Sequence, residues 1–436
     1  MSCIKKTWAI LSAAFGIAVT LSIPAGAGTI YLGDIVDEAL RSNPELAAAR
    51  QNIEALSQRP DRAAALPNPM ISIGLMNVPT DSFSFDDEAM TQKTIGLSQR
   101  FPWAGKRQLK RDMAEKEILK GEFALKSLEL KLVLDVKRSY FQLFMKNRAI
   151  EITERNRRLL KELVGIAETK YSLGKGIQQD VLKAQVELSR MRDRLITLEE
   201  ERDTLKARLN SLMNRLPQEQ MGEPPELELT NIDPDIERVQ RLSEERHPLL
   251  KGMEADLEGS RSGRLLAGIE HRPDIDLSMQ YGQRDDGPMG DRPDFVSAMV
   301  RFSIPLWRAE KEDKYVAETS ARVRQGERDY DRIRNSLFFE AARLKKGLES
   351  RRERARLFRE GIIPQAKASL DSSIAGYQVN KVDFLTLLSS QITLFNYEME
   401  YYKAVAEHEI KLAELEEVAG GDLRAMHEKT RGEKDE

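Results

Sequence analysis

The chain has 436 residues, of which 32% are charged and 6% aromatic, and its formal net charge is −3. This charge excludes the basic surface that binds nucleic acids, so we expect no nucleic-acid partner. Many charges with few aromatic residues are typical of long solvated helices rather than of a compact enzyme. The sequence contains no phosphate-binding glycine loop and no nucleophile beside a base, so we expect neither an enzyme nor a cofactor.

Residues 1–27 have the features of a signal peptide. Two lysines precede an apolar run from Trp8 to Ile23, and Ala25-Gly26-Ala27 supplies small residues for cleavage. The only cysteine, Cys3, precedes this run, so the mature chain is expected to have no thiol and no disulfide. No later stretch is apolar enough over the length of a transmembrane helix, so any membrane crossing would use strands.

The next part of the chain predicts helices followed by two strands. Asn43-Pro44 marks a helix start, with proline in the first turn. Over about 69–79 and 93–102, apolar and polar residues alternate, which is the pattern of a strand with one apolar face. The residues of that apolar face are Ile71, Ile73, Leu75, Ile95, Leu97 and Phe101.

Residues 105–215 predict one long helical hairpin. They contain no proline, and the chain turns back at Ser172–Gly176. An unbroken first arm would be roughly 100 Å long at about 1.5 Å per residue, too long to be buried in one compact domain. The return arm keeps an apolar heptad seam. The seam consists of Val181, Ala184, Leu188, Met191, Leu195, Leu198, Leu205, Leu209 and Leu212.

The same plan then repeats. Pro44 and Pro248 are 204 residues apart, Pro102 and Pro305 are 203 apart, and Tyr171 and Tyr377 are 206 apart. A near-constant offset indicates an internal duplication. We also expect a kink at the one proline inside the second hairpin, Pro364. The predicted units are a first repeat over 28–216, a linker over 217–235, a second repeat over 236–420 with strands at about 273–282 and 295–305 and a hairpin over 307–419, and a disordered tail over 421–436.

Four strands cannot close a barrel by themselves, because small membrane-spanning barrels begin at about eight strands. An open sheet in lipid would leave unpaired backbone groups at its edges. The sequence therefore favours assembly, in which several copies contribute strands to one shared barrel above a tube of helices. The polar strand faces would then line water.

The order of several short motifs resembles the TolC family of outer-membrane efflux channels over residues 30–420. Each motif is weak alone, but together they are specific. The motifs are Asn43-Pro44, Phe101-Pro102-Trp103, Gly105-Lys106, Tyr171-Ser172-Leu173-Gly174, Asp180-Val181-Leu182 and Ile304-Pro305-Leu306-Trp307. The resemblance implies an α+β membrane protein and a homotrimer in outer-membrane lipid. Its hairpins would form a periplasmic α-barrel, and four strands per chain would complete a shared 12-stranded β-barrel.

The resemblance also implies two protein partners, a periplasmic adaptor and an inner-membrane pump of the RND type. Residues 79–83 and 101–103 resemble the heavy-metal branch of CusC- and CzcC-like channels. The expected cargo is therefore heavy-metal cations or small toxic compounds. Two alternatives stay open, a channel for type I protein secretion and a soluble periplasmic coiled-coil adaptor or scaffold.

In the family, the hairpin tips constrict the periplasmic entrance and contact the adaptor. Asn380 stands where Gly174 does and Thr386 where Asp180 does, so we expect different duties for the two tips. Asp180 or Asp383, repeated by symmetry, would favour cations near the axis, or would simply stabilise a helix N-terminus. The candidate tip residues are Tyr171, Leu173, Gly174, Asp180, Val181, Leu182, Tyr377, Asp383 and Phe384.

No metal site is expected. The four histidines, His247, His271, His408 and His427, have no metal-ligand spacing. The methionines fit packing positions on strands and in the heptad seam better than a path for soft metals. Trp103, Trp307 and Tyr281 lie at strand ends, where they would form an aromatic belt or ordinary packing.

Overall fold

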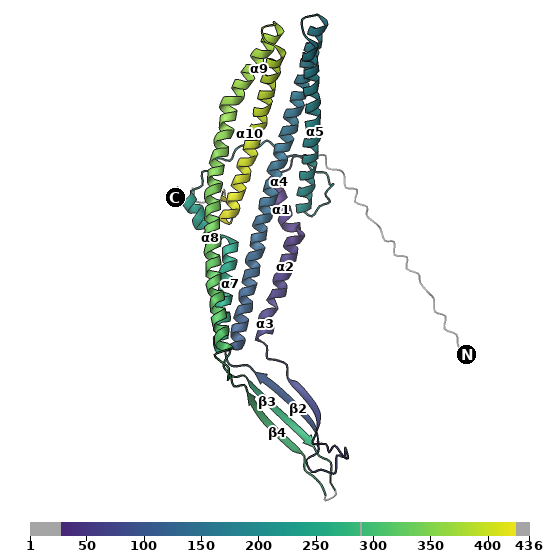
Figure 1. Cartoon of the computed structure of the whole chain (residues 1–436), viewed down its shortest axis with the longest axis vertical. Helices are drawn as coiled ribbons and strands as arrows, with labels where there is room; N and C mark the ends of the chain where they lie inside the picture. The colour runs from purple at the N-terminus through teal and green to yellow at the C-terminus, as the bar shows by residue number, and fades with distance from the viewer. Residues whose placement is uncertain (1–27, 288–289, 424–436) are drawn as a thin grey trace, which may run out of the picture.

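The computed structural model describes residues 28–287 and 290–423. The molecule is elongated, with its strands at one end and the turns of two long helical hairpins at the other (Figure 1). The first half contains α1 (Leu32–Ser42), α2 (Pro44–Ser57), α3 (Arg59–Ala64), β1 (Met70–Met76), β2 (Gln92–Phe101), α4 (Lys106–Ser172) and α5 (Gln178–Leu212). The second half contains α6 (Ile236–Arg246), α7 (Pro248–Ile269), β3 (Ile275–Gln283), β4 (Phe295–Phe302), α8 (Glu312–Leu357), a π-helical turn η1 (Phe358–Ile362), α9 (Ile363–Gln378) and α10 (Phe384–Ala419).

The strands form one antiparallel sheet in the order β1-β2-β3-β4. Its register confirms the prediction that each strand has one apolar and one polar face, because the alternating apolar residues of all four strands lie on the same face of the sheet. One such row contains Ile73, Ile95, Tyr281 and Val296. This apolar face is not covered by the chain's own helices, and Ile73 remains 83% exposed. β1 is shorter than predicted because Asn77 turns the chain at a φ of 55°.

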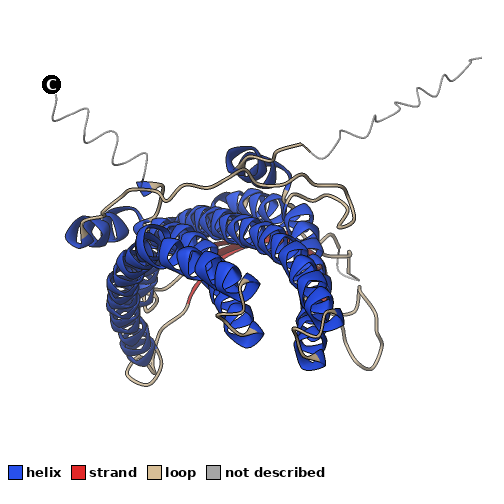
Figure 2. Ribbon diagram, turned by 90° about the horizontal axis from the view of Figure 1, so that it is seen from above, coloured by secondary structure: helices blue, strands red, loops and turns tan. Residues whose placement is uncertain are grey.

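The helices form a single curved wall. α4 runs unbroken through 67 residues and is its central element. α5 packs against α4 to make the first hairpin, α7 packs on α4 near the sheet, and α10 packs on α4 farther away. Seen along the long axis, the helices follow an arc with a concave and a convex side (Figure 2).

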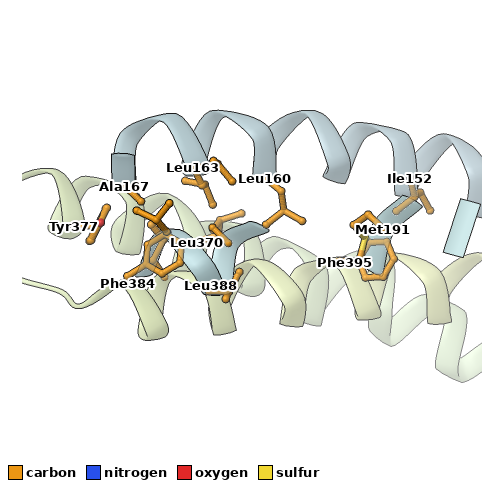
Figure 3. Packing of buried hydrophobic residues seen from close by; sticks show 14 residues of the cluster. Ile152, Leu160, Leu163, Ala167, Met191, Leu370, Tyr377, Phe384, Leu388 and Phe395 are labelled. Atoms are coloured by element: carbon orange, nitrogen blue, oxygen red, sulfur yellow. The ribbon is translucent and has the colours of Figure 1, made fainter. Parts of the chain in front are cut away.

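The two hairpins share one core at their far ends. Leu160 and Leu163 of α4 meet Leu370 of α9 and Phe384 of α10 in a continuous buried cluster (Figure 3). Met191 of the predicted heptad seam belongs to the same cluster. The first hairpin is therefore not free-standing, since its apolar stripe is buried against the second one.

The second hairpin contains a π-helical turn over Phe358–Ile362, directly before Pro364. The sequence predicted a kink at this proline. The spacing of the buried residues explains this wider turn. Before it, the buried residues Leu344, Leu348 and Ala355 follow a heptad spacing. After it, the next buried residue comes one position later than that spacing predicts. A π turn accommodates one extra residue and so returns the seam to the same side of the helix.

A short helix pair is fixed to the end of each return helix. In the first half, the Asn43 side chain accepts a hydrogen bond from the Glu45 backbone N–H at 2.9 Å and donates one to the Leu212 carbonyl at 3.0 Å. In the second half, His247 Nδ1 accepts from the Leu249 backbone N–H at 3.2 Å. The two Xaa-Pro motifs are therefore helix caps at the junctions between adjacent helices.

No helix in the described ranges combines the length and the hydropathy needed to cross a membrane. The predicted signal peptide and residues 424–436 of the predicted tail lie outside the described residues. The division into two repeats and a linker stays a prediction.

Candidate functional site at the hairpin tips

The two hairpin turns lie at the end of the molecule farthest from the sheet (Figure 1). The first turn, 173–177, connects α4 to α5, and the second, 379–383, connects α9 to α10. All nine candidate residues lie in or beside these turns.

The two turns have the same backbone conformation despite their different sequences. Gly174 has a φ of +70° and Asn380 a φ of +64°. The Lys175 N–H donates to the Lys170 carbonyl at 2.8 Å, and the equivalent Lys381 N–H donates to the Gly376 carbonyl at 2.8 Å. Asparagine tolerates the left-handed conformation better than most residues other than glycine, so this replacement leaves the turn unchanged.

A lysine that the sequence analysis did not identify connects the two tips. The Lys170 ammonium donates to Asn380 Oδ1 at 2.8 Å and to the Tyr377 carbonyl. It also lies 4.0 Å from the centroid of the Tyr377 ring. The combination of cation–π contact and hydrogen bonds fixes the end of α4 to the second turn. Nothing in the spacing of Lys170 distinguishes it from the other charged residues of α4.

The tip residues divide into a buried and an exposed group. Val181, Tyr377 and Phe384 are buried, and the Tyr377 and Phe384 rings meet edge to face with centroids 5.5 Å apart. By contrast, the apolar side chains of Tyr171, Leu173 and Leu182 are 48%, 64% and 52% exposed.

The two tip aspartates have different electrostatic environments. Asp383 is the N-cap of α10 and accepts hydrogen bonds from the Thr386 N–H at 2.8 Å and hydroxyl at 2.9 Å, which hold its pKa below the usual value. Asp180 lies in the first turn of α5, where burial raises its pKa, Lys183 lowers it and Asp383 raises it further. Asp383 therefore stabilises a helix N-terminus directly, because it caps α10. Asp180 lies in the first turn of α5, where a negative charge is favourable, but it does not cap the helix.

Among the described residues, no cluster of three or more histidine, cysteine or acidic side chains could hold a metal ion. His247 is a helix cap, and His408 is buried with its Nδ1 2.9 Å from Glu409. His427 lies outside the described residues. Trp103 packs beneath Arg272, whose guanidinium lies 5.5 Å from the ring centroid.

The residues after strand β2 form a joint between the sheet and the helical wall. Gly105 has a φ of +93° and starts α4. The ammonium of the buried Lys106 donates to the Arg272 carbonyl and to Asp274 Oδ1, both at 2.9 Å. The Gly105-Lys106 motif is thus explained by a structural joint at the base of the sheet.

Comparison with known proteins identifies the class of protein that this geometry defines. The model of the outer membrane efflux protein family matches residues 35–215, the greater part of the first half. The chain is 21% identical over 378 residues to the cobalt-zinc-cadmium resistance protein CzcC of Cupriavidus metallidurans, and the match covers 86% of each chain.

Solved structures show the same fold over nearly the whole chain. The outer-membrane channel OprN has a TM-score of 0.76 and 17% identity, covering 96% of this chain and 98% of its own. CusC has a TM-score of 0.76 and 16% identity, covering 92% and 96%. VceC of Vibrio cholerae has a TM-score of 0.76 and 17% identity, covering 90% and 96%.

Residues 35–215 of the chain match the outer membrane efflux protein family, and the chain has the fold of the TolC-like channels. It is the outer-membrane channel component of an efflux system.

Proposed function

We propose that three copies of the chain form a passive duct from the periplasm to the cell exterior. The observation that carries this proposal is the uncovered apolar face of the sheet, which extends across all four strands. Ile71 and Ile73 on β1 and Val300 on β4 are 72%, 83% and 61% exposed. Three such sheets give 12 strands, enough to close a barrel with this face toward lipid and no free edge.

The helical wall supports the same assembly. One chain supplies an arc rather than a closed tube (Figure 2). Three arcs continue the barrel as a helical tunnel across the periplasm. The polar face of the sheet and the concave side of the wall then line one water-filled passage.

Channels of this family work with a periplasmic adaptor and an inner-membrane pump, and we assign the adaptor contact to the hairpin tips. The exposed group at the tips, Tyr171, Leu173 and Leu182, offers apolar side chains to the adaptor. The buried group, Val181, Tyr377 and Phe384, holds the turns in place. Gly174, Asp180 and Asp383 shape the entrance, and energy comes from a pump of the RND type.

Heavy-metal cations or small toxic compounds are the proposed cargo, because CzcC is by name a cobalt-zinc-cadmium resistance protein. Deleting the chain and measuring growth on a panel of metal salts and drugs tests this proposal. Sensitivity to cobalt, zinc or cadmium is the expected result. Unchanged growth on every member of the panel would contradict it.

The alternatives, type I protein secretion and a soluble scaffold, make different predictions. A secretion channel leaves metal tolerance unchanged on deletion and abolishes export of a protein. A soluble scaffold does not partition with outer membranes and does not migrate differently in detergent gels before and after heating. A trimer that changes mobility on heating, found in the outer-membrane fraction, excludes the scaffold.

A further inference from the structure

All charged residues on the polar face of the four strands lie in one row. The register places Arg100 of β2 opposite Asp276 of β3, and Asp276 opposite Arg301 of β4. The other strand residues of this face are uncharged: Met70, Ser72, Gly74, Met76, Gln92, Thr94, Gly96, Ser98, Ser278, Gln280, Gly282, Phe295, Ser297 and Met299. This face therefore carries one positive charge more than it carries negative charges.

The geometry of the row exposes the positive groups. Asp276 lies between the two guanidinium groups, 3.8 Å from Arg100 and 3.9 Å from Arg301. The side chains of Arg100 and Arg301 are 58% and 60% exposed, whereas that of Asp276 is 15% exposed. Water on this face thus meets two guanidinium groups, while the single carboxylate is mostly covered.

We propose that the charged row, at the base of the sheet, attracts anions. This inference rests on the proposed function, which makes the polar face of the sheet part of a water-filled passage. Within the proposed cargo, this charge favours small toxic compounds that are anions and heavy-metal ions carried as anionic complexes. In a trimer the row becomes a ring with six arginines and three aspartates, and such a surface concentrates oppositely charged solutes.

The loops beyond the sheet have the opposite charge and provide an internal contrast. Residues 77–91 and 284–294 contain two basic residues, Arg284 and Arg292. Their acidic residues are Asp81, Asp86, Asp87, Glu88, Asp285, Asp286, Asp291 and Asp294. Any preference for anions should therefore be confined to the base of the sheet and should reverse at the loops.

Single cysteines can measure the local charge. With Cys3 in the predicted signal peptide, the mature chain has no thiol, so Ser98→Cys, two residues from Arg100 on the polar face, introduces a single one. The probes are a negatively and a positively charged methanethiosulfonate applied to the purified trimer, with each rate divided by that for a free thiol. We expect the negative probe to react roughly tenfold faster at Ser98→Cys. The control Ser82→Cys, in the acidic loop, should prefer the positive probe.

Two further changes in the Ser98→Cys background test the origin of the preference. Asp276→Asn should increase the preference for the negative probe, and Arg100→Gln with Arg301→Gln should abolish or reverse it. Reaction with both probes at equal normalised rates would overturn the inference and leave the duct intact. Reaction with neither probe in a folded trimer would show that the face is not in water, which would overturn the proposed function itself.

Discussion

The two hairpins have the same plan but different surroundings. α10, in the middle of the wall, buries 16 of its 36 residues, while α5, at the edge, buries seven of 35. The edge position leaves apolar residues of α5 uncovered, among them Leu182, Val186 and Ile196 at 52%, 52% and 68% exposure. The same arrangement of helices in the two hairpins therefore does not give them the same environment. The first hairpin has an apolar edge that its own chain does not cover, and the second is stabilised within its own chain.

The starts of the two hairpins differ most, and the largest expected effect lies there. Lys106, the first residue of α4, is buried and binds two carbonyls and Asp274. α8 begins instead at Glu312, beside an exposed ion pair between Arg308 and Asp313 at 3.2 Å. Lys106→Met should lower the free energy of unfolding by about 3 kcal/mol, because buried acceptors lose their donor. Denaturant unfolding of the purified protein measures this.

Arg308→Gln is the matched control for that change. Its ion pair is more than half exposed on both sides, so its loss should cost less than about 1 kcal/mol. Equal losses for the two variants would contradict the view that only the first hairpin is fastened to the sheet by a buried charge.

The helix caps give a pH test of the same comparison. Asn43 does not titrate, but burial lowers the pKa of His247 to about 4. The unfolded chain has an ordinary histidine pKa of about 6.5, so it binds the proton more readily than the folded chain. Stability from His247 is therefore complete above about pH 6.5 and is lost as the pH falls toward 4. At pH 5 the loss should be about 2 kcal/mol.

His247→Asn, which copies the cap of the first half, separates this effect from other titrations. The difference in unfolding free energy between the original protein and the variant should shrink or reverse between pH 7 and pH 5. A difference that stays constant over this range would show that the pKa of His247 is the same in the folded and the unfolded chain.

The spacing of apolar residues and the positions of proline and glycine predicted most of the fold. The strand faces follow from alternation, and the hairpins from a proline-free stretch with a heptad seam, because both patterns depend on local geometry. The joint made by Lys106 and the link made by Lys170 were not predicted as contacts. Each depends on a partner more than 150 residues away in the sequence, and a single sequence contains no signal for such pairs.

The third prediction compares the two tip turns. Gly174→Val should strain the first turn by about 1–2 kcal/mol, since a β-branched residue resists the left-handed conformation. Export should fall while trimers persist, because the turn lies far from the sheet and no atom lies within 4 Å of an added Cβ. Gly174→Asn, which copies the second turn, should be tolerated. Loss of trimers in Gly174→Val would show that the tip is needed for assembly.

The smallest expected effect concerns the link between the two tips. Lys170→Met keeps the length of the side chain and its packing on Tyr377, but removes the ammonium that binds Asn380. The loss should be about 1 kcal/mol, because one partly buried charged hydrogen bond disappears and water can replace it. Amide hydrogen exchange should become faster at both turns and stay unchanged in the sheet. Lys175→Met, in the same turn, is the control. Faster exchange at the first turn alone would mean that each tip is held by its own hairpin, and the two would then open independently.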